Sequence, residues 1–145
     1  MKKVFLSVPM RDRIKENIEK SLEKMKAIIK LSLGEDVEFI NTLVETKPPY
    51  KTNNEAMWYL GKSIQLLSQA DILVSVETPY WMETKGVEME KQTWLTYAMK
   101  NESRESEKYI MLPLLLVMDE KEYNELYEKR FGDCCEEELR KVDTL

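Results

Sequence analysis

One glutamate stands in this chain where a carboxyl group could do chemistry. Residues 71–76 are predicted to form an apolar strand, and Gly86 is predicted to begin a helix over 86–99 with Glu90 in its first turn. Helical spacing places Glu90 on the apolar face of this helix, together with Trp94. In an open α/β sheet, ligands bind beyond the carboxyl ends of the strands. Glu90 is therefore the first candidate for a catalytic or ligand-binding carboxylate.

A second segment is predicted to lie at the same edge of the sheet as Glu90. Residues 7–13 follow a predicted strand at 4–8 and include Arg11 and Arg13. Guanidinium groups bind phosphate and carboxylate groups well because they offer paired donors in a fixed plane. This segment therefore predicts recognition of an anionic group.

The loop before the helix, 77–86, offers contacts of a different kind. Tyr80 and Trp81 present flat rings on which a base or a sugar could stack. Gly86 allows a ligand to approach the backbone N–H groups at the start of the helix. Together with 7–13, this loop predicts a crevice for a small ligand.

Each of these residues also has a purely structural interpretation. The two arginines could be solvated charges in a first helical turn, and Trp81 could fill a core or a subunit contact. Asp71 could be no more than the polar start of a strand. Glu90 is the hardest to explain in this way, because a buried carboxylate is costly unless it is paired. An ion pair with Arg11 or Lys85 would satisfy it.

The elements that must hold these residues alternate along the chain. Apolar strands are predicted at 4–8, 37–40 and 71–76 and within 108–118; amphipathic helices are predicted at 14–31, after a capping box at 52–55, at 86–99 and at 119–131. Pro113 implies an edge position, a bulge or a strand shorter than its apolar run. The alternation predicts one domain over 1–145, a three-layer α/β/α sandwich of flavodoxin or Rossmann type with a mostly parallel sheet of four or five strands.

Composition restricts the class of protein and of partner. The 145 residues are 43% hydrophobic and 34% charged, as is typical of a globular protein, and the net charge is -5. This acidic balance argues against nucleic-acid polymers and membrane surfaces as partners. The sequence shows neither an apolar stretch long enough to span a membrane nor a secretory signal. A cytoplasmic location is expected.

Two residue types narrow the chemistry further. The chain has no histidine, which excludes Ser-His and Cys-His nucleophilic machinery and the usual zinc sites. Cys134 and Cys135 are adjacent, have no partners at metal-binding spacing, and are interpreted as incidental thiols. The acidic run 136–138 is interpreted as a solvated helical face. No metal or cofactor is expected, so carboxylates, hydroxyls, aromatic rings and backbone groups must supply any chemistry.

Several short motifs resemble those of the nucleoside 2-deoxyribosyltransferase-like superfamily, and most of all its small branch common in phages and bacteria. They are Ser7-Val8-Pro9-Met10-Arg11, Trp58-Tyr59-Leu60-Gly61-Lys62-Ser63-Ile64, Ala70-Asp71-Ile72, and Trp81 followed by Lys85-Gly86-Val87-Glu88-Met89-Glu90. The resemblance is strongest over 3–100, whereas 101–145 matches only the general strand and helix pattern.

The resemblance implies roles for individual residues. Glu90 would be the nucleophile that attacks the anomeric carbon of a nucleoside or nucleotide, and Asp71 would assist at the base or sugar. The substrate-binding residues would be Ser7, Pro9, Met10, Arg11, Tyr80, Trp81, Thr84, Lys85 and Gly86. The chain departs from the family pattern at three positions, where a strand tyrosine, an arginine and a glycine are replaced by Phe5, Lys85 and Asp12.

Three functions stay open. The first is cleavage or transfer at the N-glycosidic bond of a nucleoside or nucleoside 5′-monophosphate, with water or a second base as acceptor. The second is a non-catalytic protein that binds a nucleotide or a NAD-derived metabolite. The third, NAD glycohydrolysis, uses the same attack at a ribosyl carbon. Members of this superfamily are dimers or higher oligomers, so a homo-oligomer is expected; the base, the sugar and any need for a 5′-phosphate stay open.

Overall fold

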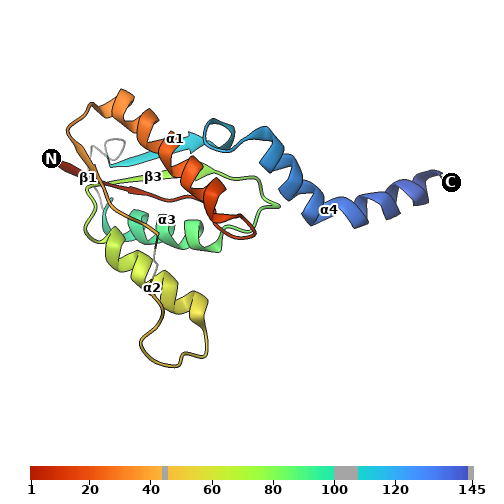
Figure 1. Ribbon diagram of the computed structural model, residues 1–145, viewed down its shortest axis with the longest axis horizontal. Helices are drawn as coiled ribbons and strands as arrows, with labels where there is room; N and C mark the ends of the chain where they lie inside the picture. The colour runs from red at the N-terminus through yellow and green to blue at the C-terminus, as the bar shows by residue number, and fades with distance from the viewer. Residues whose placement is uncertain (44–45, 100–107, 144–145) are drawn as a thin grey trace.

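The computed structural model describes residues 1–43, 46–99 and 108–143, with the side chains of all these residues except 133–143. Within this range, four strands and four α-helices form three layers with the sheet in the middle (Figure 1). The predicted three-layer α/β/α fold of Rossmann type is confirmed. The polar break predicted at 101–107 and the side chains of Cys134 and Cys135 lie outside the described part of the chain.

The sheet is wholly parallel. Its strands, in the spatial order β2-β1-β3-β4, are β2 (Val37–Phe39), β1 (Lys2–Leu6), β3 (Ile72–Glu77) and β4 (Tyr109–Pro113). The chain passes from β1 to β2 on one side and then returns past β1 to β3 on the other. The topological switch point therefore lies between β1 and β3, where Leu6 pairs with Val74. A ligand crevice is expected at the carboxyl ends of these two strands.

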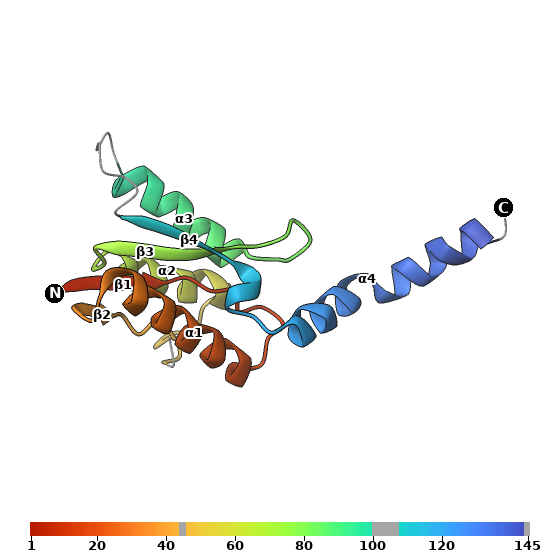
Figure 2. The ribbon, with the colours of Figure 1, turned by 90° about the horizontal axis from the view of Figure 1, so that it is seen from above.

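Helices cover both faces of the sheet. α1 (Lys15–Leu33) lies on one face, and α2 (Glu55–Leu67) and α3 (Lys85–Tyr97) lie on the other (Figure 1). After β4, a 3₁₀ helix, η2 (Leu114–Leu116), precedes α4 (Glu120–Asp143), which begins near one end of α1 and then leads away from the sheet (Figure 2). Because α2 and α3 also contact each other, their facing sides border the same space.

Alternating strand residues build two apolar cores, one on each face. Leu6 and Val74 point toward α1, which contributes Ile18, Leu22, Met25 and Ile29, apolar residues at helical spacing within the predicted helix 14–31. Phe5 and Leu73 point the other way and pack with Trp94 of α3. This alternation follows from the two-residue period of a strand, and it assigns every later strand residue to a face.

Several residues that helical spacing places on buried helix faces are exposed instead, Met57 of α2 and Tyr127 of α4 among them. Ile14 is 61% exposed because it is the N-cap residue and lies outside the helical turns of α1. Tyr97 is 73% exposed because it is the last residue of α3. The spacing of apolar residues alone does not show at which residue a helix ceases to pack against the rest of the protein.

The limits of the helices around the crevice also differ from those predicted. Asn54, rather than Thr52, caps α2, and its Oδ1 accepts a hydrogen bond from the Met57 N–H at 3.0 Å. α3 begins at Lys85, one residue early, which moves Glu90 from the first turn into the second. Both shifts are small because the capping residues lie within the predicted turns.

After α3, the elements are of the predicted types, a strand and then a helix, but their bounds differ from those predicted. Pro113 ends β4, which is an edge strand, so the interpretation of a strand shorter than its apolar run is confirmed. α4 continues to Asp143, well past the predicted end at residue 131. The tail beyond Gly132 is therefore helical backbone over most of its length.

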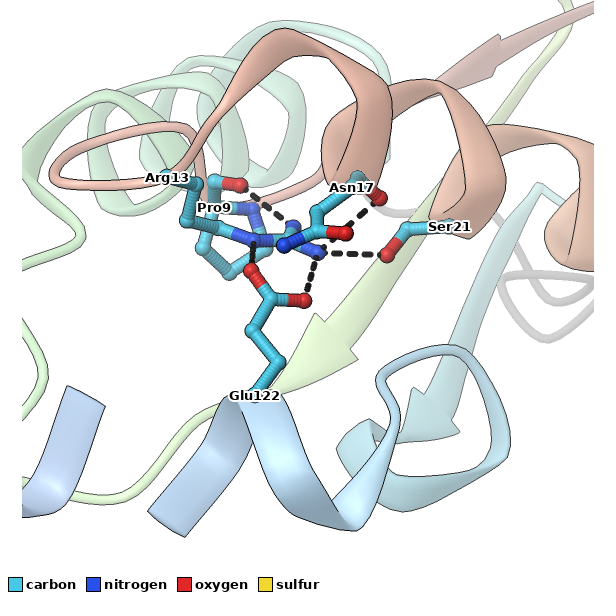
Figure 3. Close-up of polar contacts among 5 residues, drawn as sticks. All are labelled: Pro9, Arg13, Asn17, Ser21 and Glu122. Atoms are coloured by element: carbon cyan, nitrogen blue, oxygen red, sulfur yellow. Dashed lines mark hydrogen bonds and ion pairs between the residues drawn. The ribbon is translucent and has the colours of Figure 1, made fainter. Parts of the chain in front are cut away.

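Arg13 fastens the start of α4 to the body of the molecule. Its side chain is 1% exposed, and its Nε and Nη2 donate hydrogen bonds to the two carboxylate oxygens of Glu122, at 2.7 and 2.8 Å (Figure 3). The same guanidinium group donates to the carbonyl oxygens of Pro9 and Asn17 and to Ser21 Oγ. Arg13 is thus neither a solvated charge nor free for a ligand, and the prediction of two anion-binding arginines in 7–13 is wrong for this one.

Candidate functional site

A pocket of about 770 Å³ opens at the carboxyl end of β1, between the β1–α1 loop, α2 and the start of α3. The topological switch point predicts a ligand at this edge of the sheet. The walls are mainly apolar and carry a few polar groups, as is usual for small-molecule sites. The charged and hydrogen-bonding side chains that line it include Ser7, Arg11, Thr42, Asn54, Ser63, Glu83, Thr84, Lys85, Glu88 and Glu90.

Glu90 reaches the pocket from α3. Its Oε1 accepts a hydrogen bond from Ser63 Oγ of α2 at 2.9 Å. Burial raises the pKa of Glu90 above the usual 4.5, because the charged form is disfavoured away from water; the hydroxyls of Ser7 and Ser63 oppose this rise. Two serine hydroxyls, rather than a cation, therefore accompany this carboxyl group.

Ser7 comes directly after β1 and faces Glu90 from the sheet. It is 2% exposed, and its Oγ has no hydrogen-bond partner within the part of the chain that the structure describes. The hydroxyl is close enough to lower the pKa of Glu90, but its position does not complete a hydrogen bond. Buried hydroxyls are rarely left without a partner. Ser7 Oγ is thus a donor available to the carboxylate or to a ligand in the pocket.

The mouth of the pocket carries both signs of charge. Arg11 forms an ion pair with Glu83 at 2.5 Å, and their side chains are 60% and 44% exposed. Lys85 and Gly86 lie exposed at the start of α3. Exposed ion pairs contribute little net free energy, so an anionic ligand can compete with Glu83 for the guanidinium group.

The structure brings most of the predicted substrate-binding residues together around Glu90. Those that line the pocket are Ser7, Pro9, Met10, Arg11, Thr84, Lys85 and Gly86. Thr84 is the N-cap residue of α3, and its Oγ1 lies 3.3 Å from Thr78 Oγ1 in the preceding loop. Two predicted substrate-binding residues, Tyr80 and Trp81, lie elsewhere, as does Asp71, which was predicted to assist Glu90.

Asp71 lies at the opposite edge of the sheet from this pocket. It precedes β3, whereas Glu90 stands beyond the carboxyl ends of β1 and β3. The exposed Asp71 side chain accepts a hydrogen bond from the Lys3 backbone N–H at 2.8 Å, at the amino end of β1. The expectation that Asp71 assists Glu90 is therefore not met by this arrangement, because the length of β3 separates them.

The two rings expected to stack on a ligand are not among the residues that line the pocket. Tyr80 is 97% exposed. Trp81 packs edge-on against three aromatic side chains of α4, Tyr123, Tyr127 and Phe131, with ring centroids 5.4 to 6.0 Å apart. For Trp81 the alternative interpretation, a packing role, fits the structure, and its contact lies within the chain.

The polar residues of the pocket that were not predicted as site residues include Ser63, Thr42 and Asn54, together with Glu83 and Glu88. Ser63 is on the side of α2 that faces α3, one turn before the buried Leu67, so helical spacing could have placed it near Glu90. Thr42 is buried just after β2, and the rule that ligands gather at strand ends could have found it. Asn54 enters the pocket wall as the N-cap residue of α2, a position that the sequence motif misplaced by two residues.

The described residues hold no group of three or more histidine, cysteine, aspartate and glutamate side chains that could bind a metal ion. The helices in the same part of the chain are too short or too polar to cross a membrane. Comparison with known proteins finds no relative: no protein-family model, curated protein or solved structure matches the chain. The resemblance to the nucleoside 2-deoxyribosyltransferase-like superfamily stays a hypothesis drawn from the motifs.

Proposed function

We propose that the protein cleaves or transfers the N-glycosidic bond of a nucleoside or nucleoside 5′-monophosphate, with Glu90 as the nucleophile. The observation that carries this proposal is a partly desolvated carboxyl group, held by Ser63 at 2.9 Å, in the wall of a pocket large enough for such a ligand. Carboxylates are suited to this reaction because the bond breaks through an oxocarbenium-like transition state that a nearby negative charge stabilises.

The reaction would proceed in two steps at Glu90. A carboxylate oxygen forms a bond to C1′ of the sugar while the C1′–N bond breaks, and the electron pair of that bond leaves with the base, which takes up a proton. Water, or a nitrogen of a second base, then attacks C1′ and returns the carboxylate. The donors Ser63 and Ser7 suit the first step, because hydroxyls pointed at a carboxylate keep it ionised and oriented.

The charges at the mouth favour a ligand with a phosphate group. Arg11 and Lys85 both line the pocket, and the contact of Arg11 with Glu83 is an exposed ion pair. A 5′-phosphate that took this guanidinium group would release the Glu83 carboxylate. Glu83 and Glu88 are the carboxyl groups that line the pocket besides Glu90, and they replace Asp71 as candidates for protonating the departing base.

The test is release of free base, followed by chromatography. Wild type and Glu90→Gln are each incubated with ribo- and deoxyribonucleosides, their 5′-monophosphates and NAD. We expect base from wild type with at least one monophosphate, and none above background from Glu90→Gln, because an amide cannot serve as the nucleophile. Glu55→Gln, an exposed change on α2, is the matched control. Full turnover by Glu90→Gln would refute the proposal, and nicotinamide release would identify NAD as the substrate.

A nucleotide-binding protein without turnover is the second candidate. It is favoured by the distance of Asp71 from the pocket, which leaves Glu90 without the partner that the resemblance implied. This candidate predicts a rise in melting temperature with one nucleotide or NAD-derived metabolite, and recovery of that ligand unchanged. Base release in the same incubation would exclude it.

A homo-oligomer remains part of the proposal. Two methionines at the pocket, Met57 of α2 and Met89 of α3, are 68% and 49% exposed. Exposed apolar side chains beside a ligand site suit a subunit contact that would cover them and close the pocket.

A further inference from the structure

Four buried polar atoms have no hydrogen-bond partner among the described residues, and all lie on the face of the sheet covered by α2 and α3. They are Ser7 Oγ, Ser75 Oγ, Trp94 Nε1 and Tyr109 OH. The strand alternation explains why they share a face, since Ser7 and Ser75 follow the orientation of Phe5 and Leu73. Such atoms are rare in native proteins, and a group of them on one face calls for an explanation.

The strand register places Ser7 beside Ser75, with Tyr109 of β4 on the same face one pair further along. Leu6 pairs with Val74, and the Ser7 N–H donates to the Val74 carbonyl oxygen at 2.8 Å, so Ser7 stands beside Ser75. Neighbouring strands are about 4.8 Å apart, which places the two hydroxyls within reach of each other through a change of rotamer. On the other side, Tyr109 pairs with Leu73, so it stands one pair along from Ser75 on the same face of the sheet. Burial raises the pKa of Tyr109, and the nearby Ser75 hydroxyl opposes this rise.

We propose that Glu90, Ser7, Ser75 and Tyr109 form one connected row of hydrogen-bonding groups that crosses β1, β3 and β4 beneath α3, and that Tyr109 positions the Glu90 carboxyl group through the two serines. In this row the Tyr109 hydroxyl donates to Ser75, Ser75 donates to Ser7, and Ser7 donates to the Glu90 carboxylate. Tyr109 is a positioning residue, since it belongs to β4 and is not among the residues that line the pocket. The role in turnover rests on the proposed function; the connection to Glu90 does not.

The chemistry of the members suits such a row. A serine or tyrosine hydroxyl donates one hydrogen bond and accepts others. Each member of the row can therefore accept a hydrogen bond from one neighbour and donate one to the next. The Trp94 indole N–H can only donate, and it is therefore not an inner member of the row. Chains of hydrogen bonds that all point toward one charge strengthen each other, which gives a distant hydroxyl an effect on the carboxylate at the end.

Charged groups lie near both ends of the row, at Glu90 and at Tyr109. At the pocket end, Arg11, Glu83, Lys85 and Glu88 line the same cavity as Glu90, whose pKa responds to burial and to the two serine hydroxyls. At the far end, the Glu88 carboxylate raises the pKa of Tyr109. Glu88 thus acts at both ends, whereas Ser75→Ala and Tyr109→Phe leave every one of these charged groups in place.

The experiment follows the titration of the Glu90 side-chain carboxyl carbon by ¹³C NMR, with the signal assigned by its loss in Glu90→Gln. Ser7→Ala should raise the pKa of Glu90 by about one unit, since a hydrogen bond to a charged group is lost. Ser75→Ala and Tyr109→Phe should raise it by about 0.1 to 0.3 unit, in the same direction, because they act through the chain of hydrogen bonds. Tyr80→Phe, which removes an exposed hydroxyl, should leave the titration unchanged.

An unchanged Glu90 titration in both Ser75→Ala and Tyr109→Phe, with a shift in Ser7→Ala, would overturn the proposal and end the row at Ser7. Tyr109→Phe removes only one buried atom, so it keeps the test decisive if Ser75→Ala does not fold. If a substrate is found, the acid limb of its kcat/KM profile should move upward by the same amount in Tyr109→Phe. If none is found, the NMR titration still decides the connection while the proposed function fails separately.

Discussion

Glu90 shows how a side chain can weaken the fold that holds it. Its carboxyl group is largely removed from water, and the hydroxyls of Ser7 and Ser63 oppose only part of the resulting rise in pKa. The charged form is therefore less stable in the folded chain than in the unfolded chain. Residues retained at such a cost are common at functional sites, where strain or desolvation serves the reaction.

This cost gives a prediction about stability and pH. Between the usual pKa of 4.5 and the raised native value, the folded state binds more protons than the unfolded state, so wild-type stability falls as pH rises through that window. Glu90→Gln lacks this loss. We expect Glu90→Gln to melt at a higher temperature than wild type at pH 7, and the difference to shrink as the pH falls below 4.5.

The control for this prediction is Glu88→Gln, an exposed change on the same helix, for which the difference from wild type should not vary in this way with pH. Differential scanning calorimetry from pH 4 to pH 8 provides the measurement. A lower melting temperature for Glu90→Gln at neutral pH would mean that the carboxylate stabilises the fold.

Two unlike contacts join α4 to the loops that border the pocket. The first is the buried, two-pronged ion pair of Arg13 with Glu122 (Figure 3). The second is the ring of Trp81, which reaches from the β3–α3 loop into the aromatic side of α4. Both partners on the body come from loops that also supply pocket residues, so α4 steadies the two walls of the pocket without contributing a side chain to it.

Arg13→Ala should destabilise the protein severely. The change leaves the Glu122 carboxylate, which is 10% exposed, without its cation, and removing one partner of a buried ion pair costs about 3–5 kcal/mol. Urea denaturation, followed by tryptophan fluorescence, gives the loss in the free energy of unfolding. The double change Arg13→Met with Glu122→Leu should cost less than Arg13→Ala, because no buried charge then remains unpaired.

Lys24→Ala is the matched control for Arg13→Ala. Lys24 also links α1 to the start of α4, through Asp119 at 2.6 Å, but both side chains are exposed. Its loss should have a small effect that fades with added salt. Equal losses for the Lys24 and Arg13 variants would show that burial does not decide the strength of this link.

At the scale of the whole molecule, local sequence patterns predict the layers of the fold, but they do not predict which residues far apart in the sequence contact each other. The strand and helix alternation predicted the parallel sheet because each apolar run reports its own burial. The position of Glu90 in the wall of a pocket followed from the strand-end rule and one turn of helical spacing. Asp71 precedes β3 and therefore lies at the edge of the sheet opposite the pocket, a position that the motif resemblance does not take into account. Trp81 could not be assigned, because its partners are on α4, more than forty residues later.

The proposed homo-oligomer can be tested by measuring the molar mass of the protein in solution. Light scattering after size-exclusion chromatography should give a multiple of the 17.2 kDa chain mass, and Met57→Glu combined with Met89→Glu should give the monomer, because charges would be placed on the exposed apolar rim. Wild type that elutes as a monomer at every concentration would contradict the proposed homo-oligomer. A monomeric double variant that still binds ligand would show that the pocket is complete within one chain.

The ion pair of Arg13 also sets an order of events during synthesis. Its partner Glu122 is 109 positions later, and a ribosome adding about 5–20 residues per second needs about 5 to 20 s to reach it. Throughout that interval the guanidinium group that holds the Pro9 carbonyl oxygen has no carboxylate, so the nascent β1–α1 loop lacks half of its anchor. Synthesis of α4 therefore completes a pocket wall whose own residues are made about a hundred positions earlier.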